Sequence, residues 1–113
     1  MATSISVRKH GRLIIRIDQH WHSLVVRAVG ELDMATAPAF EDSLLHALES
    51  GASSLVLDLT GVTFIDPTGL RVLLWAAAHP RAQGDRLRID CGSVPVRRLL
   101  ELTHKEQPLP LTA

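Results

Sequence analysis

The sequence predicts an α/β fold, with a single mixed sheet of four to five strands covered by three or more helices. Two observations predict it. Short runs in which apolar and polar residues alternate, as they do in strands, occur first as a pair and later singly. After residue 30, such runs alternate with segments whose apolar residues recur every three or four positions, the spacing of an amphipathic helix. A strand pair followed by alternating helices and strands favours one sheet that combines a hairpin with parallel strands.

The size and composition of the chain are those of one folded domain, residues 1–113. Hydrophobic residues make up 46% of the sequence and charged residues 21%, which is typical of a globular protein. The 12 basic residues balance the 12 acidic ones. This balance argues against non-specific nucleic-acid binding, which needs a clustered positive field, and no basic run indicates a membrane surface. We expect neither nucleic acid nor membrane as a partner.

The sequence carries no targeting or spanning signal. Its longest apolar run, residues 72–78, is far shorter than the ~20 residues of a spanning helix. Residues 1–10 carry charge without an apolar centre, unlike a secretory signal. Cys91 is the only cysteine, so no intramolecular disulfide can form. We expect a cytoplasmic protein.

The N-terminal part predicts a loose arm followed by a hairpin. Residues 1–10 have the character of an arm, and residues 11–18 and 24–30 alternate as two strands. The polar residues 19–23 make a short connection, which favours an antiparallel pair.

Two histidines in this connection, His20 and His22, raise the question of a metal site. Residues two apart on a strand can face the same way, but a metal site needs more ligands, and no nearby carboxylate or thiol supplies them. An exposed hairpin tip is the better interpretation, and we expect no metal and no cofactor.

A helix is predicted to follow the second strand. Thr36 and Pro38 mark its start and Gly51 its end. Glu31 and Asp33 precede it, and paired carboxylates can perform acid–base chemistry. No histidine, nucleophile or glycine-rich phosphate loop accompanies them, so a solvated loop is the better interpretation. The apolar stripe of this helix comprises Phe40, Leu44, Ala47 and Leu48.

The central stretch predicts a buried strand, a capped loop and a second helix. Residues 55–59 form the strand, Asp66 is a preferred N-cap, and Pro67 suits the first helical position. Thr68 falls in the first turn, where backbone N–H groups lack partners and the helix dipole favours negative charge. Its hydroxyl is either a structural bystander or part of an anion site. The expected apolar stripe is Leu70, Leu73, Leu74 and Ala77.

The C-terminal part predicts a strand, a helix and an extended end. His79-Pro80 ends the second helix, and residues 87–91 alternate as a strand in which Cys91 is a small core residue. Ser93 starts the last helix. Prolines at positions 108 and 110 make residues 105–113 an edge strand or a tail.

Three motifs resemble the STAS domain family, which includes sulphate-transporter cytoplasmic domains and bacterial anti-sigma-factor antagonists. They are G-E-L-D-M-A-T-A-P at residues 30–38, L-V-L-D-L-T-G-V-T-F-I-D-P-T-G-L-R-V-L-L at residues 55–74, and V-P-V-R-R-L-L-E-L-T at residues 94–103. The resemblance covers about residues 10 to 105. The free-standing length is similar to that of the antagonists.

The resemblance implies a regulatory site. The family's phosphoacceptor, which precedes the loop glycine, matches Thr68. An anti-sigma factor that is also a serine/threonine kinase of the histidine-kinase-like fold would phosphorylate it. The family has a small hydroxyl residue where this chain has Pro67. Arg71 and Trp75 lie opposite the expected apolar stripe, so Trp75 is expected to be partly exposed. The partner-binding residues expected are Glu31, Asp33, Asp66, Pro67, Thr68, Gly69, Leu70, Arg71 and Trp75.

Three classes of function follow. The leading hypothesis is a partner-switching antagonist that captures an anti-sigma factor and is released by phosphorylation of Thr68, with a phosphatase or another STAS domain as a further partner. The alternative is an unphosphorylated scaffold subunit of a larger sensory complex. An enzyme or nucleotide-binding protein is disfavoured, because the sequence has no P-loop, G-x-G-x-x-G or triad-like set.

Overall fold

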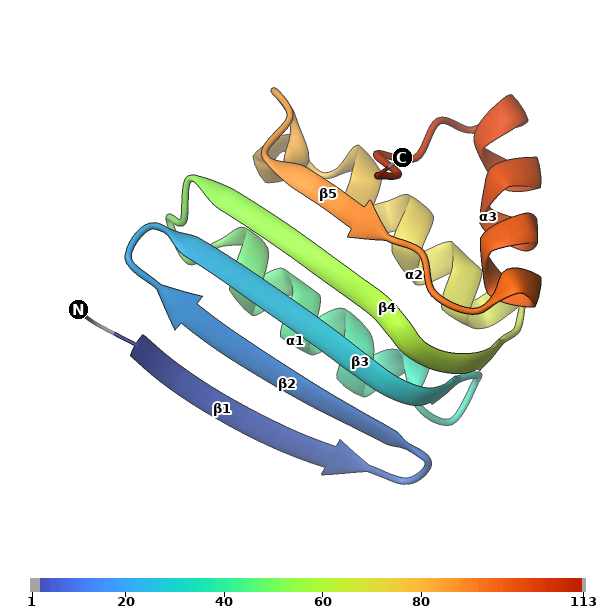
Figure 1. Ribbon diagram of the computed structural model, residues 1–113, viewed down its shortest axis with the longest axis horizontal. Helices are drawn as coiled ribbons and strands as arrows, with labels where there is room; N and C mark the ends of the chain where they lie inside the picture. Colours follow the sequence, from blue (N-terminus) through green and yellow to red (C-terminus); the bar gives the residue numbers. More distant parts are fainter. Residues whose placement is uncertain (1–2, 113) are drawn as a thin grey trace.

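A computed structural model describes residues 3–112 and has one five-stranded mixed sheet with three α-helices (Figure 1). The strands lie in sequence order across the sheet. The elements are β1 (Thr3–His10), β2 (Leu13–His20), β3 (Ser23–Leu32), α1 (Ala37–Leu48), β4 (Ser54–Ile65), α2 (Pro67–Ala78), the 3₁₀ turn η1 (Pro80–Ala82), β5 (Leu87–Asp90) and α3 (Val94–Glu106). β2 pairs antiparallel with both β1 and β3, whereas β4 pairs parallel with both β3 and β5. The predicted mixed sheet and hairpin are confirmed.

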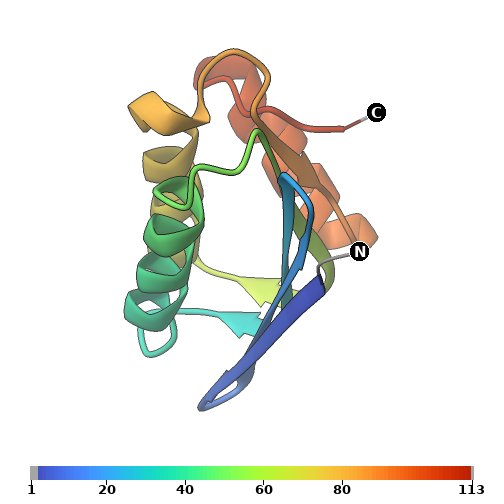
Figure 2. The ribbon, with the colours of Figure 1, turned by 90° about the vertical axis from the view of Figure 1, so that its left-hand side faces the viewer.

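The helices cover the two faces of the sheet unequally. α1 and α2 lie side by side on one face, and α3 lies on the other (Figure 2). Because side chains alternate along a strand, one side of β2, β3 and β4 faces α1 and α2 and forms the main core. Its fully buried side chains include Leu13, Ile15, Leu32, Phe40, Leu44, Leu48, Leu55, Leu57, Leu59 and Leu73.

The expectation of a loose N-terminal arm is wrong for residues 3–10. They form β1, which pairs with β2 along its whole length, from Thr3 opposite His20 to His10 opposite Leu13. The outer edge of β2 would otherwise leave a row of backbone N–H and C=O groups unpaired. The alternation in β1 is a weak signal, because its apolar residues Ile5 and Val7 remain exposed. Residues 1 and 2 of the expected arm lie outside the described residues.

The buried face of α2 differs from the predicted stripe. Leu73 is buried as expected, but Leu70, Leu74 and Ala77 are only half-buried. Apolar residues fill almost every position of α2, so hydrophobic periodicity alone does not define its inner face. The helix instead turns its smallest residue toward the end of β3. The buried residues of α2 are Gly69, Val72, Leu73 and Ala76.

The C-terminal end returns to the free edge of β5. α3 extends to Glu106, two residues into the segment expected to be an edge strand or tail. Beyond it, Leu111 forms an isolated parallel bridge with Ile89. The amide of Ile89 donates to the carbonyl of Pro110 at 2.8 Å. Short strand pairing therefore covers part of the edge of β5, and residue 113 lies outside the described residues.

Candidate functional site

The ends of β3 and β4 bring two loops together at one edge of the sheet. Leu32 and Ile65 are register partners at the ends of these parallel strands. The amide of Asp66 then donates to the carbonyl of Leu32 at 3.0 Å, which ties the second loop to the end of β3. The segments that lead into α1 and α2 therefore start side by side, as expected for adjacent parallel strands (Figure 1).

Asp66 caps α2, as the sequence predicts. Its backbone is extended, and its carboxylate oxygen Oδ1 accepts a hydrogen bond from the amide of Gly69 at 2.9 Å. Its carbonyl accepts the amide of Leu70 at 2.9 Å. Pro67 occupies the first helical position, where no N–H is needed. These hydrogen bonds fix the first turn of α2, which carries Thr68, to the end of β4.

Thr68 is half-buried and lines a groove of about 600 Å³ between the start of α1 and the outer side of α2. Its hydroxyl forms no hydrogen bond with any residue that the structure describes. The groove is lined by Met34, Ala37, Pro38, Glu41, Thr68, Arg71, Val72 and Trp75.

The groove is apolar along its length and carries opposite charges on its two sides. Met34 is 74% exposed and Trp75 is half-buried. The ring of Trp75 meets that of His79 edge to face, with centroids 5.8 Å apart. Glu41 on α1 and Arg71 on α2 supply the charges. Exposed apolar surface of this kind, rimmed by charge, is typical of protein-interaction sites.

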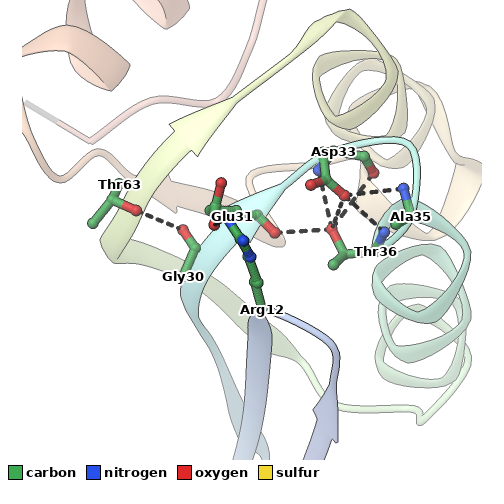
Figure 3. A network of polar contacts seen from close by, with 7 residues as sticks. All are labelled: Arg12, Gly30, Glu31, Asp33, Ala35, Thr36 and Thr63. Carbon is green, nitrogen blue, oxygen red and sulfur yellow. Dashed lines mark hydrogen bonds and ion pairs between the residues drawn. The ribbon is translucent and has the colours of Figure 1, made fainter.

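Asp33 shapes the loop that leads into α1, as Figure 3 shows. Its carboxylate oxygen Oδ1 accepts the amides of Ala35 at 2.9 Å and Thr36 at 3.0 Å. The buried Thr36 hydroxyl donates to the carbonyl of Glu31 at 2.8 Å and accepts the amide of Asp33 at 3.0 Å. Asp33 is therefore a turn-forming residue within a loop whose next two residues, Met34 and Ala35, are exposed.

Glu31 points away from this groove, toward the turn between β1 and β2. Its carboxylate contacts Arg12 at 3.2 Å (Figure 3). Gly30 lets β3 pass close to Arg12, because its φ is +118° and an added Cβ would lie 2.0 Å from the carbonyl oxygen of Arg12. Glu31 lines neither the groove nor the neighbouring hollow formed by Asp33, Met34, Ala35 and Asp66.

A second hollow lies on the other side of Arg71. It has a volume of about 500 Å³ and places the half-buried Leu70 and Leu74 at the surface. Arg71 and Trp75 line both hollows and form the ridge between them. The second hollow is lined by Pro67, Leu70, Arg71, Leu74, Trp75 and Gln107.

Comparison with known proteins identifies the family of this chain. A family model described as "Mlab, STAS domain" matches residues 15–110. The chain belongs to the STAS domain family. It is 27% identical over 99 residues to an anti-sigma-B factor antagonist of Bacillus subtilis, with 88% of this chain and 90% of that protein covered. It is 28% identical to an anti-sigma F factor antagonist of Paenibacillus polymyxa, with 88% and 86% covered.

Solved structures agree with this assignment. The crystal structure of an anti-sigma factor antagonist from Mycobacterium paratuberculosis has a TM-score of 0.71 at 28% identity, and covers 96% of this chain and 85% of its own. The structure of the anti-sigma factor antagonist SpoIIAA in its unphosphorylated form has a TM-score of 0.64 at 17% identity, and the match covers 96% of this chain and 86% of SpoIIAA. This match shows that the two proteins share a fold.

This STAS domain gathers most, but not all, of the expected partner-binding residues. Thr68, Arg71 and Trp75 share the groove, and Asp66 lies beside it with Asp33. Gly69 is buried, so it supports the loop from below. Sequence reasoning missed Met34, Pro38 and Glu41, which reach the groove because α1 packs beside α2. The one signal in the sequence is the large apolar side chain of Met34 in the loop between the predicted strand and helix.

The described residues were also considered for a metal site, for the hairpin tip and for a membrane-spanning helix. No group of three or more histidine, cysteine or carboxylate side chains among residues 3–112 could hold a metal ion. Trp21 and His22 form the exposed turn between β2 and β3, the hairpin tip that the sequence indicates. Of the helices in the described part of the chain, none combines the length and the apolar character needed to cross a membrane.

Proposed function

We propose that this STAS domain is an anti-sigma-factor antagonist that binds its anti-sigma factor through the Thr68 loop and the adjoining groove. Relatives named as antagonists match nearly the whole chain. The observation that carries the proposal is the half-buried Thr68, which lines an apolar groove and whose hydroxyl is unengaged by described residues. A buried catalytic group is not needed for this role. The domain acts by binding.

We further propose that the anti-sigma factor is a kinase that phosphorylates Thr68. In this step the Thr68 oxygen attacks the γ-phosphorus of ATP, and the bond from that phosphorus to the ADP oxygen breaks. The hydroxyl proton leaves to a base on the kinase or to solvent, and ADP departs. The free hydroxyl and its place in the first turn of α2 support this assignment. The positive end of the helix dipole at that turn favours the added negative charge.

Phosphorylation would release the partner by electrostatics. The phosphate adds about −1.5 to −2 charges at neutral pH. Asp33 and Asp66 already make the neighbourhood acidic. In a closed interface the new charge is both repelled and stripped of water. A change from mostly bound to mostly free needs a few kcal/mol of differential affinity.

The test is calorimetric titration of the chain with serine-kinase-type anti-sigma factors from the organism that encodes it. We expect Thr68→Ala to bind and to resist release by ATP, and Thr68→Glu to fold normally but bind at least about tenfold more weakly. Ser53→Glu is the matched control, because Ser53 is exposed before the opposite end of β4. Equal affinities for Thr68→Ala and Thr68→Glu would overturn the switch and favour a constitutive scaffold.

A further inference from the structure

Arg71 is placed to meet any group attached to Thr68. It lies three positions further along α2, and both side chains line the same groove. Residues three apart on a helix have Cβ atoms ~5–6 Å from each other and can interact directly. Arg71 is exposed, and it forms no ion pair or hydrogen bond with another residue in the range 3–112. Its guanidinium is therefore available.

The other charged groups around Thr68 are acidic. Glu41 lines the groove from α1, and Asp33 and Asp66 line the adjoining hollow. The Asp66 carboxylate is engaged by the amide of Gly69. Arg71 is the one cation among the described residues that line the groove. A phosphate on Thr68 would meet three carboxylates that repel it and one guanidinium that attracts it.

We propose that the Arg71 guanidinium binds the phosphate on Thr68 and so stabilises its dianionic form in the phosphorylated domain. This inference rests on the proposed phosphorylation. A guanidinium presents several N–H donors in a planar fork that matches two phosphate oxygens, which an ammonium group cannot do. Pairing neutralises the one cation among the described residues that line the groove. Phosphorylation then changes the partner surface twice, by adding negative charge and by removing the exposed positive charge.

Arg71 lies between two hollows, so its guanidinium has room to turn toward Thr68. Its side chain borders the Thr68 groove on one side and the hollow formed with Leu74 and Gln107 on the other. No hydrogen bond or ion pair within residues 3–112 has to break when the guanidinium turns toward Thr68. The pairing is therefore opposed mainly by the side-chain entropy of an exposed arginine.

The test is a phosphorus-31 NMR titration of the full chain carrying phosphothreonine at position 68, installed by genetic encoding so that no kinase is needed. The second pKa of a phosphate monoester is about 6. We expect Arg71→Gln to raise the phosphate pKa by about half a unit at low ionic strength, because a neighbouring cation favours the dianion. Arg71→Lys should give an intermediate pKa. Arg98→Gln, at an exposed position on α3, is the control for net charge.

The NMR titration tests the Arg71–phosphate pairing independently of whether an anti-sigma factor binds the domain. A phosphate pKa that rises in Arg71→Gln and not in Arg98→Gln supports the pairing. The same phosphate pKa in the wild type and Arg71→Gln overturns it, even if an anti-sigma factor binds and is released normally. If the pKa rises but no anti-sigma factor binds, the pairing stands and the proposed function fails.

Discussion

An added Cβ atom on Gly69 would lie 2.7 Å from the carbonyl oxygen of Leu32. This distance is shorter than real side chains tolerate, so only glycine lets the start of α2 approach the end of β3 so closely. The amide of Asp66 donates to the same carbonyl. The contact between these two residues therefore determines where the Thr68 loop sits and which face of α2 is buried.

Gly69→Ala should destabilise the domain and move the first turn of α2. The clash involves backbone, which cannot yield as a flexible side chain would, and we expect a loss of about 1–3 kcal/mol in the free energy of unfolding. Urea denaturation measures it. Gly61→Ala is the control, because its added Cβ would meet the Cγ2 of the exposed Val29 at 2.8 Å and backbone atoms only at 3.3 Å. An equal loss in both variants would contradict the special role of Gly69.

Asp66→Ala should cost about 1 kcal/mol of stability, because the amide of Gly69 loses its acceptor at the helix N-terminus. The measurement is the midpoint of thermal unfolding. Asp66→Asn retains an oxygen at the same place and should recover most of the loss. A melting temperature that is unchanged in Asp66→Ala would show that the cap contributes nothing.

Trp75→Ala should weaken binding of the anti-sigma factor by about 2 kcal/mol, or roughly thirtyfold, since tryptophan in an apolar groove is typical of binding hot spots. The side chain is half-buried, so the domain should remain folded. Calorimetry and circular dichroism give the two readouts. Trp21→Ala is the control, because Trp21 is 64% exposed at the hairpin tip. Unfolding of Trp75→Ala would instead identify Trp75 as a core residue.

Asp58 should make stability depend on pH in the acid range. Burial raises its pKa, but hydrogen bonds from Thr60 and Arg27 outweigh burial and hold the pKa below its ordinary value. Thr60 donates through its hydroxyl at 2.6 Å and Arg27 through Nε at 2.9 Å. A carboxyl with a lowered folded-state pKa stabilises the fold above its unfolded pKa of about 3.9, and this contribution is lost as pH falls through the folded value.

Urea denaturation at pH 7 and pH 3 tests this prediction. We expect Asp58→Asn to lose about 1 kcal/mol at pH 7 and to differ less from the wild type at pH 3. Asp85→Asn is the control, because Asp85 is an exposed turn residue with a φ of +61°, which asparagine also tolerates. A difference from the wild type that is the same at both pH values would show that the ionised form of Asp58 is not preferentially stabilised.

Much of the site could be predicted from local sequence. The Asp66 cap, Pro67 at the first helical position and Thr68 in the first turn follow from residues that are adjacent in the chain, and short-range backbone rules govern them. The second wall of the groove could not be predicted. Met34 and Glu41 reach Thr68 only through the packing of α1 beside α2, and no local pattern encodes that contact.

The sequence by itself determined the order of strands and helices from β2 onward, the mixed sheet and the loop that presents Thr68, because alternation, helical spacing and capping are local properties. Only the tertiary structure decided that residues 3–10 form a strand and which side of α2 is inside. β1 is held by backbone pairing with β2, which exposed side chains do not reveal. The rotation of α2 depends on the close approach of Gly69 to Leu32, a steric contact between segments distant in the chain.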